Sequence, residues 1–145
     1  MIGASAGGLH ALKALFTRLE DAFSIPIIIV QHISPTAENY LIHILNETGK
    51  LKVKEADEKE VPSSGHAYLA PPNYHLLVET DHTFTLTIDE RVNYARPSID
   101  VLFETAAEAY KEQLIGIILT GANADGSRGL KKIHELGGLV IVQDP

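Results

Sequence analysis

Short, continuous apolar runs alternate along this chain with segments of helical spacing, and this alternation most constrains its fold. Residues 25–30 and 114–119 are apolar runs rich in isoleucine, as expected for strands buried on both faces. Residues 7–19 instead carry leucine and phenylalanine at helical intervals. Strands that alternate with helices form parallel sheets. We therefore expect an α/β fold with a doubly wound, mainly parallel sheet flanked by helices.

The remaining elements complete this pattern. Strands are predicted near residues 2–4, 51–55, 66–70 and 139–142, and helices at 35–46, 98–111 and 126–136. Residues 75–78 and 84–88 flank a polar tip and predict a small antiparallel hairpin at one edge of the sheet. In doubly wound sheets, ligands bind beyond the carboxyl ends of the strands.

Composition narrows the classes of function. The 145 residues suffice for one domain, and we expect it to be cut at both ends from a longer chain. A net charge of −7 argues against a nucleic-acid partner. The absence of cysteine excludes disulfides, thiol nucleophiles and cysteine-based zinc sites. No apolar stretch is long enough to span a bilayer and no signal peptide is visible, so we expect a cytoplasmic protein without membrane insertion.

Ser5 is the candidate nucleophile. It occupies the centre of a G-x-S-x-G motif on a predicted strand-to-helix turn, where small neighbours leave a hydroxyl exposed. The helix that begins near Gly7 points free N–H groups toward the same place, which suits an oxyanion. A glycine turn that only packs a helix, or one that holds a phosphate, is the alternative. The dinucleotide fingerprint fails, because Ser5 replaces its second glycine.

A serine hydroxyl needs a base, and His32 is the candidate because it ends the most apolar strand. His75 is the second choice. Asp125, after the strand at 114–119, is the candidate carboxylate to orient the imidazole, although it could instead cap the next helix. Asp144 is the alternative carboxylate. No pair of histidines has metalloprotease spacing, so neither a metal nor a cofactor is expected.

Longer motifs carry a specific resemblance. They are IGASAGG at 2–8, VQHIS at 30–34, YLAPPNYH at 68–75, RPSIDVLFETAA at 96–107, GIILTGANADGSRGL at 116–130 and GGLVIVQDP at 137–145. In this order, and over nearly the whole chain, they resemble the catalytic domain of CheB-type chemotaxis methylesterases. The order Ser, His, Asp also differs from the order Ser, Asp, His of α/β-hydrolases.

The resemblance implies hydrolysis of glutamate γ-methyl esters on methyl-accepting chemoreceptors, with release of methanol, and often deamidation of receptor glutamines. It implies Ser5 as nucleophile, His32 as base and Asp125 as the orienting carboxylate. The backbone N–H of Ala122 is then expected to donate to the oxyanion, together with the backbone N–H groups of Ala6 and Gly7. The family often has threonine where Ala6 stands, and Met-Gly where residues 122–123 stand here. Many members also carry an N-terminal receiver domain, for which this chain has no room.

Three alternatives stay open at this point. One is an esterase for small esters, which predicts a closed apolar pocket instead of an open cleft. Another is a module that binds a phosphate or nucleotide at the turn around Ser5. The third is a docking domain that binds receptors without turnover, although the presence of Ser5, His32 and Asp125 counts against it.

Overall fold

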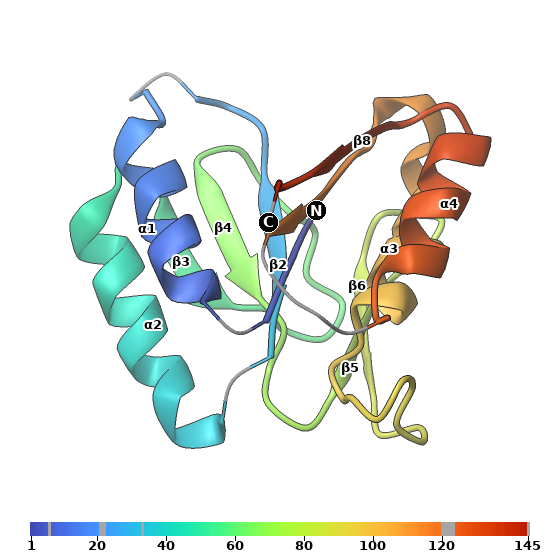
Figure 1. Ribbon diagram of the computed structural model, residues 1–145, viewed down its shortest axis with the longest axis horizontal. Helices are drawn as coiled ribbons and strands as arrows, with labels where there is room; N and C mark the ends of the chain where they lie inside the picture. The colour runs from blue at the N-terminus through green and yellow to red at the C-terminus, as the bar shows by residue number, and fades with distance from the viewer. Residues whose placement is uncertain (6, 21–22, 33, 120–123, 145) are drawn as a thin grey trace.

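A six-stranded parallel sheet forms the centre of the computed structural model, which describes residues 1–5, 7–20, 23–32, 34–119 and 124–144 (Figure 1). Every pair of neighbouring strands runs in parallel. In spatial order the strands are β3 (Lys52–Glu55), β4 (His66–Leu69), β2 (Ile27–Gln31), β1 (Ile2–Ala4), β7 (Ile115–Leu119) and β8 (Leu139–Val142). The predicted doubly wound, mainly parallel sheet is confirmed.

Helices cover both faces of the sheet. Helices α1 (Gly8–Arg18) and α2 (Pro35–Thr48) lie on one face, and α3 (Ile99–Tyr110) and α4 (Ser127–Glu135) lie on the other (Figure 1). A short 3₁₀ turn at Lys111–Gln113 follows α3. The helices begin and end within two residues of their predicted limits.

Strand β2 shows why its apolar run is continuous. Ile27 and Ile29 pack into the core beneath α1 and α2, whereas Ile28 and Val30 pack into the core beneath α3 and α4. All of them are buried, with Ile29 and Val30 at 0% exposure. A strand at the middle of a parallel sheet has no solvent face, so it cannot alternate apolar and polar residues.

The order of the strands creates a crevice next to β1. From β1 the chain first crosses to β2 through α1, and it later returns to the other side of β1 as β7. The connections on either side of β1 therefore lead away in opposite directions. At such a switch point the carboxyl ends of the strands open a space for ligands. Ser5, His32 and the segment leading to Asp125 follow the three strands β1, β2 and β7.

The antiparallel hairpin was expected at one edge of this sheet, and that placement is wrong. Strands β5 (His75–Val78) and β6 (Phe84–Thr87) form a separate two-stranded sheet. Its apolar side chains explain the difference, because Leu76, Val78 and Phe84 are buried in the core that they share with α3. The hydroxyl of Thr105 on α3 also accepts a hydrogen bond from the Val78 N–H, at 3.0 Å.

The edges of the large sheet are β3 and β8. Strand β8 leaves Leu139, Ile141 and Val142 between 46% and 62% exposed. In the parts of the chain that the structure describes, none of the helices combines the length and the apolar character needed to cross a membrane.

Candidate active site

Ser5 lies on the turn between β1 and α1. Its carbonyl accepts hydrogen bonds from the Gly8 N–H and from the side-chain amide of Gln31, both at 2.9 Å. The Ser5 carbonyl is thereby tied both to the last residue of β2 and to the start of α1. A nucleophile needs such a fixed position, because small displacements from the reacting geometry cost much of the rate.

Two glycines allow this turn to form. Gly7 has φ of 80°, in the left-handed region that residues with a side chain rarely adopt. Gly8 has ordinary dihedral angles but no room, since a Cβ there would lie 2.4 Å from Gln31 Oε1 and 2.8 Å from the Ala4 Cβ. The small residues of the motif therefore serve the close approach of α1 to β1 and β2.

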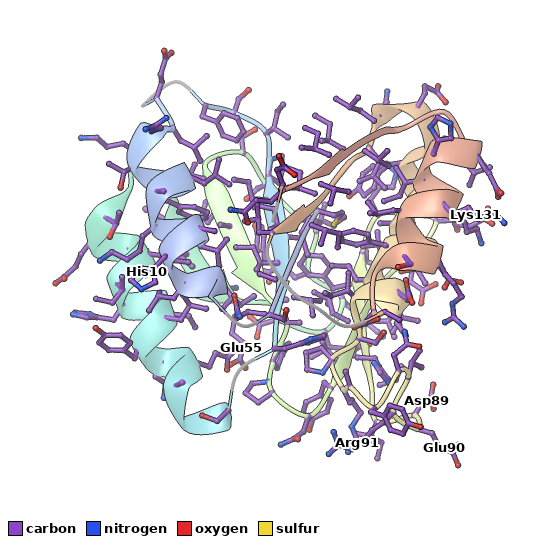
Figure 2. All side chains as sticks on the ribbon, viewed as in Figure 1. His10, Glu55, Asp89, Glu90, Arg91 and Lys131 are labelled. Carbon is purple, nitrogen blue, oxygen red and sulfur yellow. The ribbon has the colours of Figure 1, made fainter. Side chains whose placement is uncertain are left out.

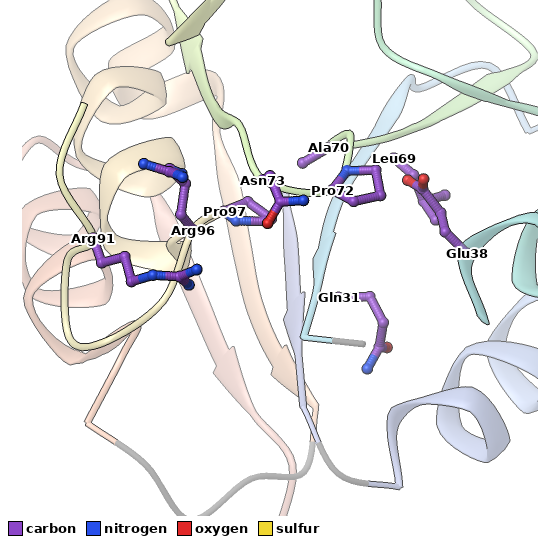
Figure 3. Close-up of a pocket in the computed structure, with 9 residues that line it drawn as sticks. All are labelled: Gln31, Glu38, Leu69, Ala70, Pro72, Asn73, Arg91, Arg96 and Pro97. Carbon is purple, nitrogen blue, oxygen red and sulfur yellow. The ribbon is translucent and has the colours of Figure 1, made fainter. Parts of the chain in front are cut away.

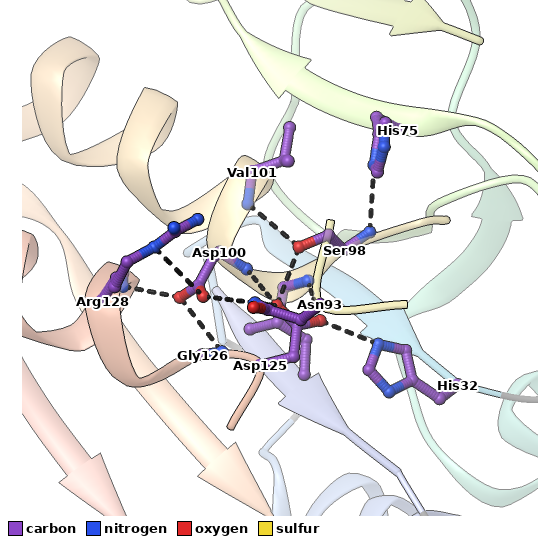
Figure 4. A network of polar contacts seen from close by, with 11 residues as sticks. His32, His75, Asn93, Ser98, Asp100, Val101, Asp125, Gly126 and Arg128 are labelled. Atoms are coloured by element: carbon purple, nitrogen blue, oxygen red, sulfur yellow. Dashed lines mark hydrogen bonds and ion pairs between the residues drawn. The ribbon is translucent and has the colours of Figure 1, made fainter. Parts of the chain in front are cut away.

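His32 directly follows β2 and is joined to the end of β1, because its backbone N–H donates to the Ala4 carbonyl at 2.9 Å. Its ring points toward Asp125, which follows β7 in the sequence. Nε2 of His32 lies 3.0 Å from Oδ2 of Asp125 (Figure 4), and the imidazole remains 17% exposed. The structure thus brings together two of the residues predicted from separate strand ends.

The Asp125 carboxylate contacts five groups, of which His32 forms an ion-pair contact and four donate hydrogen bonds. Besides His32, its donors are the Ser98 hydroxyl (2.7 Å), the Ile99 N–H (2.6 Å), the Asp100 N–H (3.0 Å) and the Asn93 side-chain amide (3.1 Å). The side chain is completely buried. A buried carboxylate is stable only when donors replace its lost hydration, and this one has donors on both oxygens.

These donors keep Asp125 ionised. Burial alone would raise the pKa of its carboxyl, but the hydrogen bonds from His32, from the backbone of Asp100 and Ile99 and from Ser98 outweigh burial and lower the pKa to about 2. The carboxylate can therefore hold the His32 imidazole in one tautomer and stabilise it when it becomes protonated.

Asp125 and Asp100 cap each other's helices. Asp125 precedes α4, yet its carboxylate accepts from the first N–H groups of α3. Asp100 lies in the first turn of α3, and its Oδ1 accepts from the N–H groups of Gly126 and Gly129 at the start of α4, at 3.0 and 2.7 Å. Figure 4 shows this exchange. Each carboxylate satisfies unpaired helix donors and also lies near the positive end of a helix dipole.

His75 has a structural place. The ring is 2% exposed, its Nδ1 accepts from the Ser98 N–H at 3.2 Å, and its Nε2 lies 2.8 Å from the Glu90 carbonyl. A carbonyl can only accept, so Nε2 carries the proton and the ring is neutral. With both nitrogens engaged by backbone, His75 is not available as the base. His32 is therefore the better candidate of the two.

Other predicted residues are placed as follows. Asp144 is exposed beyond β8, and Gly7 is exposed at the turn that precedes α1. Ala6 and Ala122 lie outside the described residues, so their part in an oxyanion site stays a prediction. Within the described ranges, no group of three or more histidine, aspartate or glutamate side chains is arranged to hold a metal ion.

Sequence reasoning missed three residues of this network: Asn93, Ser98 and Asp100. Ser98 caps α3, because its hydroxyl accepts from the Val101 N–H at 3.4 Å, and the same hydroxyl donates to Asp125. Asn93 has a positive φ of 54°, and its amide joins Asp100 to Asp125. The polar residues in the motif RPSID were a signal, but their partner lies about 25 positions away.

The sequence model of one protein family, described as CheB methylesterase, matches residues 1–145, which is the whole chain. This chain belongs to the CheB methylesterase family. A relative from Leptospira interrogans is 58% identical over 145 residues, which cover 100% of this chain and 75% of the relative.

Two further matches come from Thermotoga maritima. One, named protein-glutamate methylesterase/protein-glutamine glutaminase, is 37% identical over 147 residues, and this chain covers 43% of its length. The other is the crystal structure of a CheB methylesterase catalytic domain, with a TM-score of 0.94 at 37% identity. That match covers 99% of this chain and 77% of the crystallised one, so the family fold extends over the site described above.

Proposed function

We propose that this chain is the catalytic domain of a protein-glutamate methylesterase, which hydrolyses glutamate γ-methyl esters on chemoreceptors and acts in the cytoplasm. Deamidation of receptor glutamines is the second reaction of the same site. The contact between His32 and the buried Asp125, at the strand ends beside Ser5, is the observation that carries the proposal. Family membership over residues 1–145 supports it.

The reaction follows the chemistry of a serine hydrolase. Because Asp125 engages Nε2 of His32, Nδ1 is the nitrogen that takes the proton from the Ser5 hydroxyl as it attacks the ester carbonyl. The imidazolium then donates this proton to the methoxy oxygen of the tetrahedral intermediate, which leaves as methanol. A water molecule, deprotonated by the same nitrogen, attacks the acyl-enzyme and frees the glutamate carboxylate and Ser5.

The negative oxygen of each tetrahedral intermediate needs donors. We assign these to the backbone N–H groups of Ala6 and Gly7, which precede α1 in the sequence, and of Ala122. The first N–H groups of a helix have no partner within it, and the helix dipole favours negative charge there. Donors that are fixed before the reaction stabilise the intermediate more than mobile water does.

A methanol-release assay tests the proposal. A receptor that carries radiolabelled methyl esters is incubated with the protein and with Ser5→Ala, and volatile methanol is counted. We expect Ser5→Ala to lower turnover about ten-thousand-fold or more. Ser24→Ala is a matched control, because this exposed serine precedes β2 at the end remote from His32. Turnover by Ser5→Ala at the wild-type rate would exclude the mechanism.

A further inference from the structure

Two hollows adjoin the candidate active site, and they share a wall formed by Gln31, Arg91, Arg96 and Pro97. The larger hollow, about 450 Å³, also has His32 in its wall. The smaller, about 260 Å³, extends between β2, β4 and α2 as far as Glu38 (Figure 3). A substrate side chain that occupies the larger hollow therefore lies close to His32 and to both arginines.

Arg91 is the exposed cation of this wall. Within the described parts of the chain, no carboxylate pairs with its guanidinium, and Figure 3 shows it pointing into the space that Gln31 borders from the other side. Other arginine and lysine side chains near α3, such as Arg128 and Lys132, are instead paired with acidic residues. Arg91 therefore keeps its charge available for a ligand.

Arg96 holds in place the backbone segment that leads to Arg91. Its Nη1 donates to the carbonyls of Ile88 and Asp89, at 3.1 and 3.3 Å, and so fixes the start of the segment that carries Arg91. Backbone bonds in both directions between Val92 and Ala95, each 3.0 Å, close the turn that follows. Hydrogen bonds thus hold the backbone on both sides of Arg91, so binding of a ligand by Arg91 costs less conformational entropy.

The same turn is tied to the candidate triad. Asn93, inside the turn, donates to Asp125 at 3.1 Å and to Asp100 at 2.8 Å. Tyr94 follows it with a positive φ of 63° and is 98% exposed at the rim of the larger hollow. The hydrogen bond from Asn93 to Asp125 therefore also holds the turn that follows Arg91.

Two arginines, Arg91 and Arg96, line both hollows. Among the residues that the structure describes, no acidic side chain lines the larger hollow. Glu38 lines the smaller one, but burial and its contact with Glu55 raise the pKa of its carboxyl to about 8, so it is mainly neutral at pH 7. The net charge of the whole chain is −7, and Asp89 and Glu90 precede Arg91, so an acidic substrate must be bound by a direct contact with these arginines and not by a general positive field.

We propose that Arg91, supported by Arg96, binds a carboxylate of the substrate protein next to the reacting ester and so makes the enzyme select acidic segments. This inference rests on the function proposed above. A guanidinium matches a carboxylate with two parallel hydrogen bonds, which gives direction as well as attraction. Each ester that is hydrolysed also leaves a carboxylate, so neighbouring esters become better substrates as the reaction advances.

The test compares two receptor fragments that carry the same radiolabelled methyl esters. One keeps its natural acidic residues within one helical turn of each ester, and the other has alanine at those positions. Arg91→Gln should raise KM for the acidic fragment about tenfold, with kcat within about twofold, and should have little effect on the alanine fragment. Arg91→Lys should fall between, since it keeps the charge but loses the planar fork.

Lys131→Gln is the matched control for charge. Lys131 lies on α4, well away from Arg91 (Figure 2), so this variant should treat both fragments as the wild type does. An equal effect of Arg91→Gln on both fragments, or no effect on either, would overturn the inference while leaving the methylesterase intact. Absence of methanol release by the wild type from either fragment would instead overturn the proposed function together with the inference.

Discussion

Asp125 and Glu38 are both 4% exposed, but their surroundings drive the two carboxyls in opposite directions. Asp125, on the α3 and α4 side, meets five donors, and the pKa of its carboxyl falls to about 2. Glu38, on α2, meets the acidic Glu55, and burial with this contact raises its pKa to about 8. Burial alone therefore does not set the charge of a carboxyl, since the donors around it decide.

The opposite pKa shifts of Asp125 and Glu38 give the two sides of the candidate site different properties. On the Asp125 side, an anion contacts His32 and also caps α3, so the mechanism proposed above makes catalysis and stability depend on the same oxygens. On the Glu38 side, a mainly neutral carboxyl lines a hollow next to the arginines. We expect changes on the first side to affect folding and rate together, and changes on the second to affect the two separately.

The largest expected effect on pH dependence lies in acid. The folded pKa of Asp125, about 2, is below its ordinary value of 3.8, so its contribution is present above pH 4 and is lost as pH falls toward 2. A shift of this size corresponds to about 2 kcal/mol. Ser98→Ala removes one donor, which should cost about 1 kcal/mol at pH 7 and raise the pKa of Asp125.

Urea unfolding from pH 7 to pH 2 measures this effect. The destabilisation by Ser98→Ala should shrink as pH falls from about 3 toward 2, because Asp125 of the folded protein becomes protonated as pH approaches its pKa of about 2. Ser24→Ala, an exposed serine, supplies the baseline. A constant difference between Ser98→Ala and the wild type across this range would contradict the role given to the Asp125 donors.

A smaller effect of opposite sign is expected for Glu38. Its folded pKa is raised, so its contribution is complete below about pH 4.5 and is lost as pH rises toward 8. Glu38→Gln cannot ionise, and its stability relative to the wild type should increase by about 2 kcal/mol between pH 5 and pH 8, after allowance for solvent screening. Glu47→Gln, at an exposed position of the same helix, is the control for unfolding at each pH. Parallel pH curves for Glu38→Gln and the wild type would show that Glu38 is already ionised.

The sequence predicted the sheet because β2 and β7 carry uninterrupted apolar runs, which are typical of strands inside a parallel sheet. Strand β2 is buried along its whole length as expected, whereas β7 is only partly buried, so its expected burial on both faces is wrong. The ends of the predicted strands then indicated Ser5, His32 and Asp125 as neighbours. The hairpin was misplaced because alternation of side chains defines a strand pair but not the surface on which it packs. The burial of Leu76 and Phe84 against α3 decides that question.

The donor network could not be predicted for a related reason. Asp125 was considered as a cap for the helix that follows it, whereas it caps α3, whose first residues lie about 25 positions earlier. The structural place of His75 was hidden in a similar way, since the partners of its ring, the Ser98 N–H and the Glu90 carbonyl, are backbone groups 23 and 15 positions away. Backbone groups leave no signature in a sequence, so only the fold reveals such contacts.

The most direct test of the double role of Asp125 is to measure methanol release and urea unfolding on one preparation of Asp125→Asn. An asparagine at this position carries no charge. Its NH2 group also faces hydrogen-bond donors in place of an oxygen that accepted from them. We expect turnover by the folded fraction to fall about ten-thousand-fold and the free energy of unfolding at pH 7 to fall by about 3 kcal/mol. Loss of turnover with unchanged stability would show that the caps of α3 do not depend on this carboxylate. Wild-type turnover would show that His32 does not need it.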